Sequence, residues 1–231
     1  YLLRAEALYK INIQNPPFLY QNFSPLKEED IFHSLLQVGL DYSHAIVLKG
    51  NHFGSLLESD FFKSLVLLFS ILPFSQIEKR ILLPLENWKG FGEPEFLKAF
   101  FYWTLYEKIE RRKSFLSKAK AALEKAVIIN PHFSMAWTLL GYCHLLERDI
   151  EESEKAFQRA QEIEPTSAFN FLYWACLLAY RKKYSLAFQK LFEAVDHGIN
   201  HLRWIENNPY FKELRCRSEW KVLKERFSKG E

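Results

Sequence analysis

Apolar residues recur three or four positions apart along most of the chain, which is the spacing of one face of an α-helix. Short breaks in this pattern are rich in proline, glycine and asparagine, as in "NPPF", "FSPL", "KGNHFGS" and "WKGFGEP". The pattern therefore predicts an all-α fold. In the front part of the chain it predicts helices at 2–13, 28–48, 59–72 and 76–86, and we interpret residues 1–88 as a helical N-terminal region or degenerate repeat.

From about residue 100 to residue 201 the pattern recurs every 34 residues. Pro131 and Pro165 are one period apart, and four further columns keep the same spacing. Two columns hold large apolar residues and two hold small ones: Trp103, Trp137 and Phe171; Leu123, Phe157 and Leu191; Ala119, Ser153 and Ala187; and Ala126, Ala160 and Ala194. Two helices approach closely only where their contact residues are small, so Gly141 and Ala160 should open a notch for Phe157.

The segment from about 100 to 201 resembles three tetratricopeptide repeats (TPR), a family of helix-turn-helix units of 34 residues. The middle copy matches the family's pattern best, at Trp137, Leu140, Gly141, Phe157, Ala160 and Pro165. The resemblance implies an α-solenoid, in which each hairpin stacks on its neighbours because one hairpin cannot bury both of its faces. The expected domains are the N-terminal region, three TPR-like repeats at 94–201 and a C-terminal helical cap at 202–231.

The expected cap keeps a helical pattern but departs from the 34-residue period. It contains an "NPxFxxLR" stretch at 208–215, which resembles the turn that often closes such arrays. Many charged residues follow this stretch, and they would supply the polar outer side that the end of an array needs.

The resemblance implies a concave inner wall built from the first helix of each repeat, with its residues free of the inter-helix core. In the predicted register this wall is mostly apolar, which suits a partner's amphipathic helix or an extended apolar peptide. The candidate partner-binding residues are Phe101, Thr104, Lys108, Met135, Thr138, Tyr142, Phe169, Leu172, Tyr173 and Cys176, with Arg111 adding charge beside Lys108. Alternatively, the helices of 1–88 fill this wall, because an uncovered apolar surface is unfavourable in water.

Motifs that would indicate catalysis are absent from the sequence: no nucleophile elbow, Walker loop, HExxH or EF-hand loop is found. A phosphate cradle at "KGFGEPE" is disfavoured because Glu93 and Glu95 would repel an anion. His197 and His201 are four apart, but Gly198 between them is expected to end the helix, so they are not expected to bind a metal. We therefore expect no enzymatic activity, no cofactor and no metal.

The formal net charge is +3 and the isoelectric point is near 8.6, which is too mild to require an anionic partner. Two basic clusters stand near tyrosines, and we interpret them as cations at the last turns of first helices, where the helix dipole favours them. RNA binding through these clusters is the alternative. The clusters are Lys108, Arg111, Arg112 and Lys113, and Arg181, Lys182 and Lys183.

Cys143, Cys176 and Cys216 are an odd number without CxxC spacing, so free thiols and a cytoplasmic location are expected. The apolar stretch at 61–74 contains a lysine and is shorter than the ~20 residues that cross a bilayer, so no transmembrane segment is expected. The chain begins at Tyr1, which suggests a start that is processed or cut from a longer protein.

The leading hypothesis is a non-catalytic scaffold or adaptor that binds a protein or peptide partner and assists complex assembly. The second is a regulatory or docking module of a larger protein, and the third is RNA binding. Self-association stands beside binding to a different protein, since the open ends of repeat arrays can pair.

Overall fold

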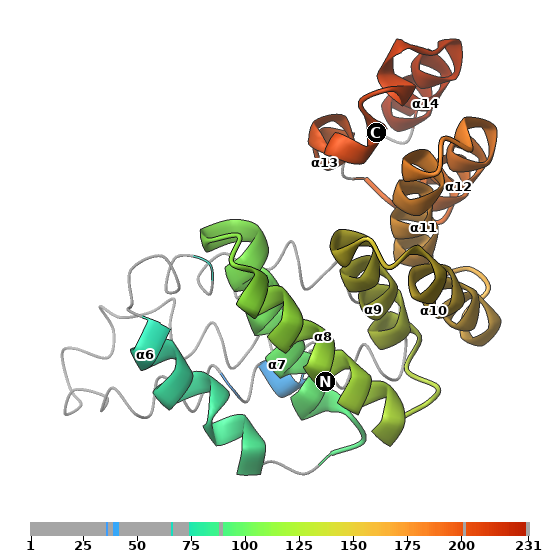
Figure 1. Ribbon diagram of the computed structural model, residues 1–231. Helices are drawn as coiled ribbons and strands as arrows, with labels where there is room; N and C mark the ends of the chain where they lie inside the picture. Colours follow the sequence, from blue (N-terminus) through green and yellow to red (C-terminus); the bar gives the residue numbers. More distant parts are fainter. Residues whose placement is uncertain are drawn as a thin grey trace, which may run out of the picture. The chain divides into compact units, whose positions relative to one another are not determined.

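The computed structural model describes residues 36, 39–41, 66, 74–87, 90–200 and 202–229 (Figure 1). Every regular element among these residues is a helix, so the fold is all-α. None of the helices found there is both long and apolar enough to cross a membrane. The helices predicted at 2–13, 28–48 and 59–72 fall almost wholly outside the described residues.

The chain divides into two compact units, Tyr1–Pro131 and His132–Glu231. In the first unit, the segment predicted to be helical at 76–86 is helical, but it is built from three short elements. These are α6 (Phe74–Ile77), a π-helical turn η2 (Glu78–Leu82) and a 3-10 turn η3 (Pro84–Asn87).

The first unit also holds a hairpin of two longer helices, α7 (Glu93–Thr104) and α8 (Lys113–Ile129). A π-helical turn, η4 (Leu105–Ile109), extends α7. Gly92 precedes α7 with φ of 100°, and a Cβ built there would lie 3.1 Å from the carbonyl oxygen of Ala126. The start of α7 therefore lies against the end of α8, and a side chain at this position would be strained.

The second unit consists of two stacked hairpins followed by short closing elements. The hairpins are α9 (Ser134–Glu147) with α10 (Ile150–Ile163), and α11 (Ala168–Tyr180) with α12 (Tyr184–Asp196). Helix α11 packs on both α9 and α10, which makes the hairpins neighbours in an α-solenoid. The closing elements are α13 (Leu202–Asn207), η5 (Pro209–Phe211), η6 (Leu214–Cys216) and α14 (Ser218–Lys229).

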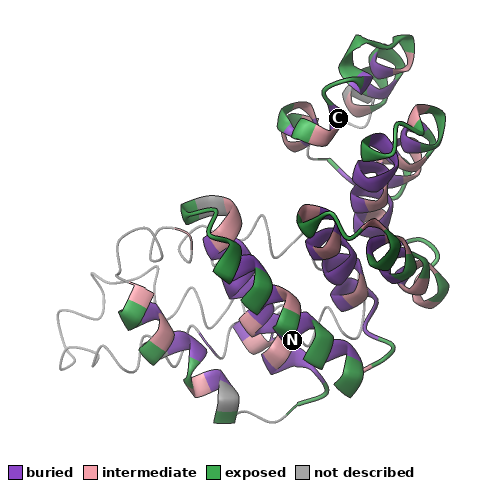
Figure 2. Ribbon diagram, viewed as in Figure 1, coloured by how far each residue is buried: buried purple, intermediate pink, exposed green. Residues whose placement is uncertain are grey.

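The 34-residue period is visible in the helix boundaries of the second unit. Helix α11 starts 34 residues after α9, and α12 starts 34 residues after α10. All residues of the two small-residue columns are buried, as the sequence predicted. Figure 2 shows α9 and α11 almost wholly buried, whereas α10 and α12 alternate buried and exposed positions.

Gly141 and Phe157 confirm the predicted notch between α9 and α10. A Cβ at Gly141 would lie 2.9 Å from the Phe157 ring, which is fully buried. The Ser153 hydroxyl, on α10, donates to the Gly141 carbonyl oxygen at 2.8 Å. The two helices can approach here because Gly141 has no side chain that would clash with the Phe157 ring. The hydrogen bond from Ser153 also satisfies the Gly141 carbonyl oxygen.

The chain turns after the second hairpin at Asn208, whose side chain accepts a hydrogen bond from the Tyr210 backbone at 3.0 Å. Phe211 and Leu214 follow and are fully buried. Helix α14 packs on α12, and the Arg226 guanidinium contacts both Asp196 oxygens at 2.6 and 2.7 Å. The "NPxFxxLR" stretch thus folds α14 back onto the last hairpin.

Candidate functional site

The residues predicted to face a partner fall into two groups, one in each unit. In the first unit, Phe101 and Thr104 lie on α7, Lys108 on η4 and Arg111 in the turn after it. The Lys108 side chain lies outside what the structure describes. In the second unit, α9 and α11 carry the remaining residues: Met135, Thr138, Tyr142, Phe169, Leu172, Tyr173 and Cys176.

Aromatic rings connect the predicted residues of the second unit. Tyr142 on α9 stacks on Tyr173 of α11 with 4.5 Å between ring centroids. Phe169 lies 6.3 Å from Tyr173, and Trp204 of α13 meets Tyr173 edge-on at 5.8 Å. The structure therefore brings two repeats of the predicted wall into one aromatic row, and α13 contributes the ring at its end.

Buried hydrogen bonds hold the same helices together. Asn170 on α11 donates to the Phe157 carbonyl oxygen at 3.1 Å and accepts from the Thr138 hydroxyl at 3.4 Å. The Asn208 amide lies 3.8 Å from the Cys176 sulfur and donates to it. Thr138 and Cys176 are thus part of contacts between elements rather than of an open wall.

Nine of the eleven predicted residues have buried side chains, and the most exposed of these, Phe169, is only 8% exposed. The expectation that they are free of the inter-helix core is therefore wrong. For the seven residues of the second unit, the reason is that α9 and α11 pack on each other, and α13 and η5 add contacts to α11. Partner binding by these residues stays a prediction. The nine are Phe101, Thr104, Met135, Thr138, Tyr142, Phe169, Leu172, Tyr173 and Cys176.

Arg111 is the exposed residue among the predicted ones whose side chains the structure describes, with its side chain 63% exposed. It forms an ion pair with Glu107 at 3.3 Å and lies 5.9 Å from the centre of the Tyr106 ring. The guanidinium thus has a carboxylate and a ring beside it just after η4, and it stays open to solvent.

The arginines of the basic clusters lie beyond the helix ends, whereas Lys108 lies in the last turn of η4 and Lys113 begins α8. Helix α11 ends at Tyr180 and η4 ends at Ile109, so the predicted placement is wrong for the arginines that follow. Their charges meet carboxylates instead: Arg112 pairs with Glu110 at 2.6 Å, and Arg181 pairs with Glu154. RNA binding through these clusters stays a prediction.

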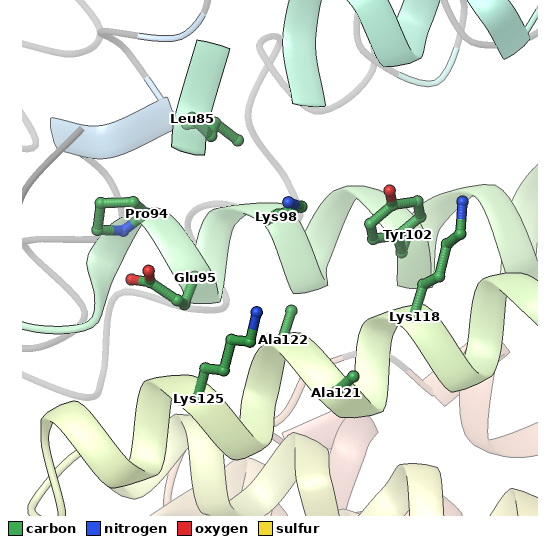
Figure 3. Close-up of a pocket in the computed structure, with 9 residues that line it drawn as sticks. All are labelled: Leu85, Pro94, Glu95, Lys98, Tyr102, Lys118, Ala121, Ala122 and Lys125. Atoms are coloured by element: carbon green, nitrogen blue, oxygen red, sulfur yellow. The ribbon is translucent and has the colours of Figure 1, made fainter. Parts of the chain in front are cut away.

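A cavity of about 490 Å³ lies in the first unit, between η3, α7 and α8 (Figure 3). Helix α7 contributes residues 95, 98 and 102, which share one face because they are three and four apart. Helix α8 contributes residues 118, 121, 122 and 125, which share a face for the same reason. The lining residues are Leu85, Pro94, Glu95, Lys98, Tyr102, Lys118, Ala121, Ala122 and Lys125.

Three of the side chains that line this cavity are lysines. Figure 3 shows Lys125 extending from α8 toward α7, with Lys98 on the facing helix and Glu95 beside it. Lys118 lies 5.3 Å from the centres of the Phe74 and Tyr102 rings, and its amine is 3.5 Å from Glu78. The cavity can therefore offer ammonium donors to an anionic group.

The predicted pair His197 and His201 is only half described, because His201 lies outside the described residues. His197 is exposed and its ring lies 5.5 Å from that of Phe171. Cys143, Cys176 and Cys216 are free thiols, as the sequence predicted.

Sequence reasoning missed Asn170 and the lysines of the cavity, and it placed Asn208 in a turn without its contact to Cys176. Asn170 could have been found, because it is a single amide within the apolar run "AFNFLYW" of a predicted helix, where a buried amide needs partners. The lysines gave no such signal, since lysine on an amphipathic helix usually faces water.

The comparisons with known proteins yield one short likeness. No family model matches the chain. A stretch of 56 residues is 43% identical to Peroxisome biogenesis protein 5 of Arabidopsis thaliana, and it covers 24% of this chain and 8% of that protein. The stretch is thus a small part of the relative. This partial likeness and the packed helical hairpins are consistent with a protein built of helical repeats.

Proposed function

We propose that this chain is a non-catalytic scaffold that binds a protein partner and assists the assembly of a complex. The observation that carries the proposal is the recurrence of the α9–α10 hairpin in α11–α12 at an offset of 34 residues, with a shared core. Stacked hairpins of this kind present extended surfaces on a rigid frame, which suits holding a partner.

The partial likeness adds support of a different kind. The matched protein is named for peroxisome biogenesis, which describes the building of an organelle and not a chemical conversion. A role in assembly is the part of that name which we carry over to this chain. The cytoplasmic location expected from the sequence stays a prediction.

The partner's position is the finer part of the proposal. We place it at Arg111 in the first unit, because the side chain of this predicted residue is accessible. Within the second unit, the Trp204 ring meets Tyr173 edge-on, so a partner that contacts Tyr173 would have to displace that ring.

Capture from native extract tests both parts of the proposal. The full chain is compared with Arg111→Glu and with Lys221→Glu, a reversal of the same charge on the exposed side of α14. We expect a reproducible set of bound proteins that Lys221→Glu retains and Arg111→Glu loses. If Arg111→Glu retains them too, the proposed position is wrong. If none of the three binds more than an unrelated helical protein of equal charge, the scaffold function is wrong.

A further inference from the structure

The cavity between η3, α7 and α8 is lined by lysines, and their positive charges are not needed for one hairpin to stack on the next. Among the described residues, three lysines and Glu95 line it, and Glu78 lies 3.5 Å from the amine of Lys118. The lysines are Lys98, Lys118 and Lys125. No described segment occupies the space of about 490 Å³ between them. Lysines outnumber carboxylates among these described residues, so the space favours an anionic ligand.

The spacing of the lysines distinguishes between kinds of anion. Lys118 and Lys125 are seven residues apart on α8, so their backbone positions are separated by about 10.5 Å along the helix axis. The amine of Lys118 contacts Glu78 and the rings of Phe74 and Tyr102, which hold it away from Lys125. The charges are therefore spread along a groove, which suits several carboxylates in a row better than a single compact phosphate group.

The floor of the cavity favours a polypeptide. Ala121 and Ala122 lie between the two lysines of α8 and contribute only methyl groups. Small residues at this place allow the backbone of another segment to approach the helix closely. Ala121 and Lys125 are exposed, so a ligand can reach them from solvent.

We infer that this cavity docks an acidic segment of the protein partner, with Asp or Glu side chains about 10 Å apart that pair with Lys118 and Lys125 while Lys98 faces them from α7. The inference rests on the proposed function. Pairs of this type are partly solvated, so binding through them is moderate in strength and weakens with salt.

The probe is a labelled, alanine-rich helical peptide whose glutamates are spaced as Lys118 and Lys125 are, and its control carries glutamine in their place. Binding to the full chain is measured by fluorescence anisotropy. We expect the glutamate peptide to bind and the glutamine peptide not to bind, with an affinity that falls as NaCl rises from about 0.05 to about 0.5 M.

Three variants locate the bound peptide. Lys125→Glu reverses a charge in the cavity, and Ala121→Trp fills the floor while every charge is kept. Both positions are exposed, so the fold should survive, which circular dichroism checks. We expect each variant to raise the Kd of the glutamate peptide about tenfold or more, whereas Lys221→Glu on α14 leaves it within about twofold.

Equal binding by wild type and Ala121→Trp would overturn the inference, since the peptide would then respond to charge without entering the cavity. Equal binding of the two peptides would overturn it as well. A uridine oligonucleotide that binds more tightly than the peptide and depends on Lys125 would reassign the cavity to nucleic acid. Absence of peptide binding while proteins are still captured from extract would reject the docking site and leave the scaffold function standing.

Discussion

Gly141 is the residue at which α9 and α10 tolerate least additional volume. In Gly141→Ala the new methyl group would lie 2.9 Å from the Phe157 ring, which is fully buried and has little room to move. Overpacking of this kind costs about 1–3 kcal/mol, and the better helix propensity of alanine offsets about 1 kcal/mol of that. We expect a net loss of about 1 kcal/mol in the free energy of unfolding, measured by urea denaturation.

The control for this prediction is Phe157→Leu, which removes the ring. The loss in Gly141→Ala combined with Phe157→Leu should be smaller than the sum of the two single losses, because the clash disappears. If Gly141→Ala proves as stable as the wild type, the notch is not a tight contact.

Tyr184 links stability to alkaline pH. Its hydroxyl donates to the Glu213 carboxylate, and this hydrogen bond holds the pKa of the phenol above its usual 10.0, although Arg217 beside it acts in the opposite direction. A raised pKa in the folded state means that the stabilisation is complete below pH 10 and is lost as the pH rises through the folded value. The thermal unfolding midpoints of wild type and Tyr184→Phe should therefore converge as the pH is raised above 10. A constant difference between the two midpoints would contradict this.

For single residues, the sequence predicts burial where it follows from the local repeat pattern. Ala160 and Phe157 are buried as predicted, because their size recurs with the period of the hairpin. The partners of Asn170 could not be derived, since a hydrogen bond to the Phe157 carbonyl depends on how one hairpin is placed on the next.

Among the elements, α14 carries a buried apolar residue and an ion pair to α12, which should differ in strength. Leu223 is fully buried, whereas the side chain of Arg226 is 42% exposed in its ion pair with Asp196. Leu223→Ala should cost about 2–5 kcal/mol, and Arg226→Ala less than about 1 kcal/mol, because exposed ion pairs contribute little. Hydrogen exchange of the α14 amides measures both, and equal losses of protection would show that the ion pair dominates.

The hairpin helices could be predicted as elements, but the π-helical turns η2 and η4 could not. Apolar periodicity reports which residues share a face, and it does not separate an α-helix from a single wider turn. Helix α8 begins at Lys113, one turn earlier than α10 and α12 begin in their repeats. This shift is the physical counterpart of the looser pattern in the first copy.

For the whole molecule, the division after Pro131 leads to a prediction about the second unit. Residues 132–231 contain their own buried residues, including Phe157, Leu191 and Phe211, and each hairpin there packs on its neighbour. Because repeat arrays are stabilised by neighbouring units, this fragment should be helical and should unfold cooperatively on heating. Circular dichroism checks this, and a gradual loss of signal without a transition would contradict it.

The burial of Tyr142 and Leu172 was beyond sequence reasoning, because a register of repeats identifies a face but not what covers it. The cavity was missed for a related reason. It depends on Lys98 of α7 and Lys118 of α8 lining the same space, and each helix by itself shows an ordinary solvated face.

The turns inside the two hairpins of the second unit share a backbone feature. Arg148 and Lys182, one period apart, have φ of 66° and 58°, a left-handed conformation that costs a non-glycine residue about 1 kcal/mol. The helices on either side impose this conformation, since neither residue favours it. A search for further copies of this hairpin should therefore score backbone geometry at the turn and ignore which amino acid stands there. Glycine adopts this conformation at no steric cost, so replacing Arg148 and Lys182 with glycine should remove the same backbone strain at both turns.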